Sequence, residues 1–164
     1  MKNLIATALV LLATVGATQA QSIYFDNLYK DYQVSEEAMT LSLTGNLMTM
    51  ASWFADEGDD QEMLNELGKS IDRVKMVMLE DGNRMSDREI DEFRRMITTK
   101  EKFEELMIVR DGDETVEVLA IEKDGLMSEI IMLIQGDEEF VVMDIWGEID
   151  MKHINDIIDG VDFH

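Results

Sequence analysis

"FEELMIVRDGDETVEVLAIEKDGLMSEIIMLIQGDEEFVVMDIW", residues Phe103–Trp146, consists of four apolar runs of strand length separated by short acidic turns that contain glycine. Two of these turns contain Asp-Gly, a pair that tolerates positive φ and is typical of β-hairpins. We therefore predict a four-stranded antiparallel meander that ends at Gly147. The run Ile130–Ile134 is apolar on both faces, so we expect it to form a central strand with helices packed against the sheet.

The residues before the meander predict a helix followed by a strand. Aromatic and apolar residues recur at helical spacing in Ile23–Tyr32, which is expected to be a short helix with an aromatic face. Apolar residues then alternate with Ser and Thr over residues 39–44, which favours a strand. Residues 46–56 return to helical spacing, and a loop and a further helix are expected up to Gly68. A single helix over residues 35–56 is the alternative, because short apolar runs fit both structures.

A second strand and a second helix precede the meander. "SIDRVKMVMLEDG", residues 70–82, alternates with period two and predicts a strand. Ser86 followed by Glu89 is a capping box, the usual start of a helix. The apolar residues of this helix form one stripe that we expect to be buried: Ile90, Phe93, Met96 and Ile97.

A last helix is expected after the meander, over residues 150–161, with Asp150 as its N-cap. Gly147 would be the residue that lets the last strand turn into this helix. The predicted fold class is therefore α+β, with helices packed on one face of a mixed, mostly antiparallel sheet that ends in a four-stranded meander and a final helix. One domain over residues 21–164 accounts for the length.

The first 20 residues, "MKNLIATALVLLATVGATQA", have the three parts of a secretory signal peptide. Lys2 supplies the positive charge, Leu4–Val15 the apolar segment, and Thr18 and Ala20 the small residues before the cleavage site. Cleavage after Ala20 would make Gln21 the first residue of the mature chain. The alternative is an N-terminal membrane anchor, for which the apolar segment is short.

Composition narrows the location and the partners. The chain has no cysteine, so we expect neither a lipid anchor nor disulfides. Together with the signal peptide, this predicts an exported, soluble protein of the periplasm or the exterior. No later segment is long and apolar enough for stable membrane insertion. The net charge is −22, and loss of Lys2 with the signal would make it −23. Such a charge disfavours nucleic acid and anionic lipid as partners.

Two short patterns resemble the DUF4252 family of exported bacterial proteins, many of which are lipoproteins. The first is "F-x-x-L-Y", here Phe25–Tyr29, and the second is the strand-Gly-helix pattern "IWGEIDMKHI", residues 145–154. The resemblance extends over most of residues 24–160, and it implies export and the boundaries of the folded domain. Because the function of the family is unknown, it implies no catalytic residues. The anchoring cysteine of the lipoprotein members is missing here, so a membrane tether is not carried over.

The candidate binding residues are Asp144, Trp146 and His153, which lie in and just after the last strand. Asp144 and Trp146 share one face of that strand. If the face is open it is a binding surface, and if it is buried Asp144 needs a partner such as the Trp146 indole or a nearby lysine. His153 has carboxylates three positions away but no second histidine, so no metal site is expected.

The acidic loops do not form an EF-hand. The run that starts at Asp111 has Val116 where the calcium loop needs glycine, and its flanks are expected to be strands. Loose calcium binding by Asp56–Asp60 stays open. The chain has 14 methionines, of which Met48, Met50, Met76 and Met78 fall on apolar faces, and this favours core packing over copper binding.

No nucleophile motif, phosphate loop or histidine triad is present in the sequence, so we expect neither an enzyme nor a cofactor. The favoured function is a non-enzymatic, acidic protein-interaction or regulatory module that binds another envelope protein, through an acidic surface or a sheet edge. The alternative is a carrier of a small ligand or a metal, and an enzyme of unrecognised type is the third hypothesis.

Overall fold

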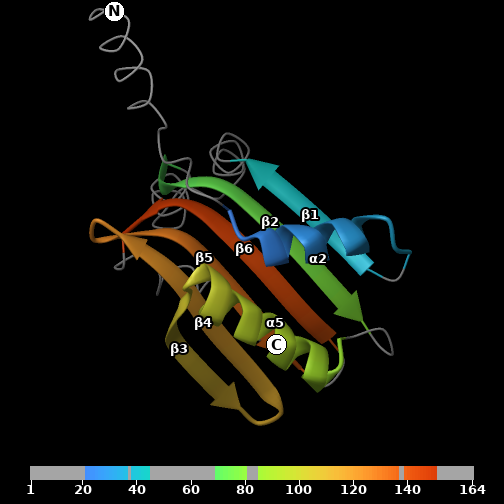
Figure 1. Ribbon diagram of the computed structural model, residues 1–164. Coiled ribbons are helices and arrows are strands. Elements are labelled where there is room, and N and C mark those ends of the chain that lie inside the picture. The colour runs from blue at the N-terminus through green and yellow to red at the C-terminus, as the bar shows by residue number, and fades with distance from the viewer. Residues whose placement is uncertain (1–20, 37, 45–68, 81–84, 137–138, 151–164) are drawn as a thin grey trace, which may run out of the picture.

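The computed structural model describes residues 21–36, 38–44, 69–80, 85–136 and 139–150 (Figure 1). In these residues a six-stranded sheet carries two α-helices, both on the same face. The elements in chain order are α2 (Ile23–Gln33), β1 (Ala38–Thr44), β2 (Ile71–Glu80), α5 (Asp87–Met96), η3 (Ile97–Glu101), β3 (Glu104–Asp111), β4 (Glu114–Lys123), β5 (Leu126–Gln135) and β6 (Glu139–Ile149).

The strands lie in the order β1-β2-β6-β5-β4-β3, and every neighbouring pair is antiparallel. The predicted four-stranded meander is confirmed as β3 to β6, and β5 lies in the interior of the sheet as expected. The prediction of a mixed sheet is wrong, because β1 and β2 also pair in antiparallel fashion. The last strand of the meander pairs with β2, which joins the two halves of the chain in one sheet.

The hairpin turns explain the Asp-Gly pairs of the meander. Gly112 has a φ of 57° between β3 and β4, and Asp124 and Gly125 have φ values of 56° and 84° between β4 and β5. Glycine adopts this left-handed region without steric cost, and aspartate does so more readily than most residues. At the β4–β5 turn, two consecutive residues with positive φ match the twist of the paired strands, so this turn fixes the register of its hairpin.

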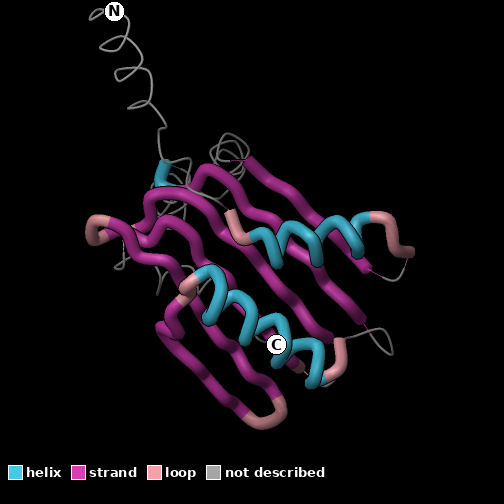
Figure 2. The backbone as a smooth tube through the Cα atoms, viewed as in Figure 1, coloured by secondary structure: helices cyan, strands magenta, loops and turns pink. Residues whose placement is uncertain are grey.

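Both described α-helices begin at a serine cap. The Ser22 hydroxyl accepts a hydrogen bond from the Phe25 N–H at the start of α2, and the predicted capping box of Ser86 and Glu89 is confirmed at the start of α5. The chain continues from α5 into η3, a wider π-helical turn, which ends where Lys102 adopts a φ of 68°. Figure 2 shows α2 and the α5–η3 helix lying across the same side of the sheet.

The core has two layers, one on each face of the sheet. Between the helices and the sheet lie aromatic and aliphatic side chains, including Phe25, Tyr29, Ile90, Phe93, Ile97, Phe103, Leu119, Ile131, Leu133, Phe140 and Val142. The stripe predicted for the second helix is part of this layer, with Met96 half-buried. The opposite face buries a second set that includes Val74, Val116, Val118, Ile130, Met132, Ile134, Val141 and Ile145. Met76, Met78 and Met143 pack against this second set, in line with methionine as a core residue.

Two further expectations are settled within the described residues. Residues 38–44 form a strand, so the alternative of one helix over residues 35–56 is wrong there. The last strand does not end at Gly147, because β6 continues to Ile149. The helix predicted over residues 46–56, the helix expected to end near Gly68 and the final helix after Asp150 lie outside the described part of the chain.

Gly147 is required by a close approach of two backbones and not by a turn. It pairs with Ile71 at an irregularity of β2, where the register shifts between Ile71 and Arg73. A Cβ atom at position 147 would lie 2.1 Å from the Ser70 carbonyl oxygen and 2.9 Å from the Ile71 Cα. From Arg73 onward, β2 runs in uninterrupted register with β6.

Arg94 of α5 forms hydrogen bonds with a buried carboxylate of the sheet, that of Glu117. Its Nε donates to both oxygens of Glu117 at 2.8 and 2.7 Å, and its Nη1 lies 2.6 Å from Asp91. Glu117 is only 2% exposed. A charge buried to this degree needs its partner, because without one it loses hydration and gains nothing in return.

Arg94→Met is therefore expected to lower the free energy of unfolding by about 3 kcal/mol, measured by urea denaturation. Arg95→Met is the matched control on the same helix. Arg95 is exposed and lies 4.0 Å from Glu92, so its loss should change stability by about 0.5 kcal/mol or less. Equal effects of the two substitutions would show that the Glu117 pair does not stabilise the fold.

Candidate functional site

Charged side chains gather on the helix-covered face of the sheet, where a purely apolar layer would be expected. Lys75 of β2 lies directly opposite Asp144 of β6, and Arg73 lies opposite Trp146. Glu129 of β5 pairs with Trp146 from the other side. Because side chains alternate between faces along a strand, these residues all point toward α2 and η3. The sheet register alone therefore brings two cations and two carboxyls together.

The start of α2 is bound to this group of charges. The Ser22 N–H donates to Glu129 Oε1 at 2.7 Å, and the Ser22 hydroxyl donates to Glu101 Oε2 at 2.5 Å. The Ile23 N–H donates to Glu101 Oε1 at 2.6 Å. Two carboxyls from distant parts of the chain thus accept the free N–H groups at the helix start. We call the whole set the polar cluster: Ser22, Asp26, Arg73, Lys75, Glu101, Glu129 and Asp144.

Glu129 and Asp144 form a buried carboxyl pair, with exposed fractions of 2% and 1%. Burial, and next the charge of Asp144, raises the pKa of Glu129 to about 8. Burial also raises the pKa of Asp144 to about 6, although the hydrogen bond with Glu129 and the charge of Arg73 act in the opposite direction. Two like charges so close cannot both be ionised cheaply, so burial and mutual repulsion favour retention of one proton by the pair at neutral pH.

Of the two cations of the polar cluster, Lys75 has a carboxylate within hydrogen-bond distance and Arg73 does not. Lys75 Nζ lies 2.5 Å from Asp26 Oδ1 and 5.1 Å from the centre of the Tyr29 ring. Arg73 Nη2 lies 3.9 Å from Asp144 Oδ2, beyond hydrogen-bond distance. Asp144 Oδ1 has no hydrogen-bond partner among the described residues, and neither have Arg73 Nε and Nη2. Within the described part of the chain, the polar cluster thus has four carboxyls and two cations, so its carboxyls outnumber its positive charges.

The carboxyl pair lacks the access that acid–base catalysis on an external substrate needs. A general acid or base must come within hydrogen-bond distance of the substrate. Both carboxyls are buried, and neither lines the pocket described next. What the arrangement can do is hold a proton or a positively charged group that the chain itself supplies.

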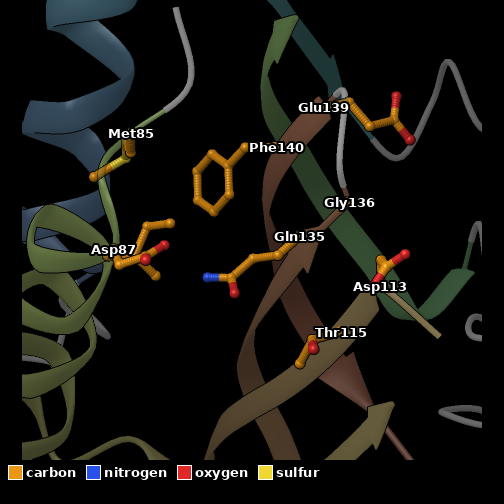
Figure 3. Close-up of a pocket in the computed structure, with 9 residues that line it drawn as sticks. Met85, Asp87, Asp113, Thr115, Gln135, Gly136, Glu139 and Phe140 are labelled. Atoms are coloured by element: carbon orange, nitrogen blue, oxygen red, sulfur yellow. The ribbon is translucent and has the colours of Figure 1, made fainter. Parts of the chain in front are cut away.

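A small pocket of about 180 Å³ opens elsewhere, at the start of α5 (Figure 3). Met85, Asp87 and Phe140 line it together with residues of the β4 and β5 ends. Figure 3 shows the carboxylate of Glu139 turned away from that of Asp87, so the acids around the pocket do not converge. In the described residues no group of three histidines or carboxylates could hold a metal ion.

The outer strand β1 is uncharged and exposes apolar side chains. Its seven residues, "AMTLSLT", carry no charge, and Met39 and Leu41 are 53% and 39% exposed. Both side chains lie on the face of the sheet opposite the helices, because they pair with Met78 and Met76. Among the described strands β1 pairs with β2 alone, so its other edge presents backbone donors and acceptors.

The candidate residues predicted from the sequence differ in burial, and two of them lie outside the described residues. Asp144 is buried, which is the case in which it needs a partner. Lys75 lies opposite it in the sheet register but pairs with Asp26, and Arg73 Nη2 lies 3.9 Å from Asp144 Oδ2. Trp146 is half-buried, with the Arg73 guanidinium 6.0 Å from its ring centre. Gln21 lies beside the polar cluster at the start of α2, while Ala20 and His153 lie outside the described residues.

Sequence reasoning missed Glu129, Glu101 and Ser22. Glu129 had a signal, because it interrupts the apolar run "LMSEIIMLIQ" of a strand predicted to be buried on both faces. A carboxyl at such a position needs a specific partner. Glu101 and Ser22 had no comparable signal, since both look like ordinary polar residues near helix ends.

The comparisons with known proteins concern the family and not the activity. A family model described as a domain of unknown function, DUF4252, matches residues 32–157. The matched region contains all six strands and α5 but begins near the end of α2. No match to a curated protein was found. No helix in the described part of the chain is long and apolar enough to cross a membrane. Since the matched region covers well over half of the sequence, this chain belongs to the DUF4252 family.

Proposed function

We propose that this protein is an exported, non-enzymatic interaction module that binds an extended segment of another envelope protein along β1. The observation that carries the proposal is the uncharged edge strand with its exposed Met39 and Leu41. Strand addition of this kind uses backbone hydrogen bonds for affinity and alternate side chains for specificity.

The two edges of the sheet differ in a way that supports β1. Edge strands are commonly protected from pairing by charged side chains. Half of the residues of β3 are charged, namely Glu104, Glu105, Arg110 and Asp111. In β1 no residue has this protection. Because one edge strand of the sheet is uncharged and the other is charged, one defined pairing, at β1, is favoured over unspecific aggregation.

The surface of the chain also restricts the partner. A bound segment that places apolar side chains beside Met39 and Leu41 would cover both exposed residues. The net charge of −22 favours basic residues around that segment and speeds its encounter with the module. The partner is thus expected to contribute an extended, alternating apolar segment with basic flanks.

The small-ligand alternative has less support. Typical ligand sites enclose roughly 300–1,000 Å³ and are mostly apolar. The pocket at the start of α5 is about 180 Å³ and includes Asp87, Asp113 and Glu139. Such a site is small and acidic for an organic ligand.

Leu41→Lys tests the proposal, because a charge on β1 should disrupt pairing without disturbing the core. The partner is recovered by crosslinked co-purification with the tagged chain from the envelope of the host, and is then bound again in pure form. We expect Leu41→Lys to weaken that binding at least tenfold, which corresponds to about 1.4 kcal/mol.

Val109→Lys is the matched control on the other edge, since Val109 is 43% exposed on β3. It should leave binding unchanged, and both variants should unfold at the temperature of the wild type. Equal binding by Leu41→Lys and the wild type, or loss of binding only in Val109→Lys, would contradict the assignment of β1.

A further inference from the structure

The residue before the first described helix is buried and is held by hydrogen bonds to distant carboxyls. Ser22 is 3% exposed although it precedes the first helix. Its N–H and hydroxyl bind Glu129 and Glu101, and these carboxyls lie 107 and 79 positions further along the chain. Segments near a chain end are commonly loose unless specific contacts hold them. The polar cluster supplies such contacts, and it does so at the residue that follows Gln21.

Among the described residues, the polar cluster has more carboxyls than cations. Four carboxyls belong to the polar cluster: Asp26 of α2, Glu101 of η3, Glu129 of β5 and Asp144 of β6. In the described part of the chain, the only cations of the cluster are Arg73 and Lys75 of β2. Lys75 is already paired with Asp26. Asp144 Oδ1, on a side chain that is 1% exposed, has no partner among the described residues. One further cation with several N–H donors would meet the deficit.

We propose that the polar cluster is a binding site for the α-ammonium group that cleavage after Ala20 creates on Gln21. The inference rests on the export that forms part of the proposed function. Consecutive Cα atoms are about 3.8 Å apart, so the new amino group lies within one residue length of the Ser22 N–H that binds Glu129. It carries a full positive charge and three donors, where the uncleaved chain has a neutral peptide group.

The site links processing to the stability of the sheet. With the ammonium group bound, Glu129 is ionised and forms an ion pair, and the start of α2 is held against β5 and η3. In the uncleaved chain Glu129 must stay protonated or remain uncompensated. Cyclisation of an N-terminal glutamine, in which the α-amine displaces ammonia from the side-chain amide to give a neutral lactam, would abolish the site.

The test varies the charge of the N-terminus and the carboxyl separately. A cleavable fusion yields the mature chain with a free terminus, and Gln21→Ala keeps the α-ammonium group while preventing cyclisation. The same chain is compared after N-terminal acetylation, with and without Glu129→Gln, by thermal unfolding at pH 7. We expect the free terminus to raise the melting temperature by about 4 °C over the acetylated one. With Glu129→Gln this difference should largely disappear.

A second readout separates an ion pair from a general effect of acetylation. The pKa of the α-amino group, followed by NMR, should lie above its ordinary range of about 7.7–8.0 and return to that range in Glu129→Gln. Equal melting temperatures of free and acetylated chains, or an α-amino pKa in the ordinary range, would overturn the proposal. Because the terminus is made in vitro, these results do not depend on the β1 partner, and the N-terminal mass of the chain from its host tests the cleavage itself.

Discussion

Gly147→Ala is expected to lower the free energy of unfolding by about 4 kcal/mol, the largest effect of any single methyl group that the described structure predicts. The added Cβ would lie 2.1 Å from the Ser70 carbonyl oxygen and 3.1 Å from the Asp72 nitrogen. Both are backbone atoms, so relief requires β2 to move away from β6. The measurement is urea unfolding followed by circular dichroism.

Gly136→Ala is the matched control for this substitution. At position 136 the nearest atoms to an added Cβ lie at 3.7 Å, an ordinary contact distance. We expect a change of about 0.5 kcal/mol or less. If Gly147→Ala proved as mild as Gly136→Ala, the close approach of β2 and β6 would be wrong, and with it the register that places Arg73 beside Asp144.

The second large effect is a dependence of stability on pH that runs against the usual behaviour of acidic groups. In the chain that retains the residues before Gln21, the folded pKa of Glu129 is raised from 4.5 to about 8 and that of Asp144 from 3.8 to about 6. A raised pKa means that the folded state binds the proton more tightly than the unfolded state. The resulting stabilisation is fully present below the unfolded pKa and is lost as pH rises through the folded pKa.

Stability is therefore expected to fall by roughly 4 kcal/mol between pH 5 and pH 8 in that uncleaved chain. Glu89 has the opposite sign, because hydrogen bonds from Ser86 lower its pKa, but its effect lies below 4.5 and outside this window. Glu129→Gln should flatten the profile and stabilise the chain at pH 8, since an amide accepts the Ser22 hydrogen bond without a charge. Urea unfolding at several pH values measures this.

Glu105→Gln is the control for the loss of a carboxyl as such, since Glu105 is exposed on β3. Its profile should match that of the wild type. If the uncleaved wild-type chain were equally stable at pH 5 and pH 8, the buried pair would not hold the shared proton. In the mature chain the α-ammonium group should reduce the loss at pH 8, which joins this prediction to the N-terminal site.

The local signals in the sequence were sufficient for most of the sheet. Asp-Gly pairs located the hairpins because positive φ is a property of the residues themselves. Alternation located β1 and β2, and the Ser86–Glu89 pair located α5. These features depend on a few neighbouring residues, so no knowledge of the rest of the chain was needed.

The missed features depend on contacts between distant residues. Gly147 looked like a turn residue because nothing in its neighbourhood reveals the Ser70 carbonyl that approaches it. The pairing of β2 with β6 joins segments about 70 positions apart, and only that pairing places Lys75 opposite Asp144. Glu101 became a partner of Ser22 through the packing of η3 against the start of α2. Asp144 was noted in the sequence as a carboxyl that would need a partner if buried, but the charged residues around it lie on other strands.

The most direct test of the proposed function is residue-resolved hydrogen exchange of the mature chain, free and bound to the partner that it recovers from its host. If the partner adds a strand, alternate amides of Ala38–Thr44 should become protected, because every second N–H of an edge strand points outward. The amides of β3, Glu104–Asp111, should exchange as in the free chain. Protection on β3 or on the helices, with β1 unchanged, would contradict the account.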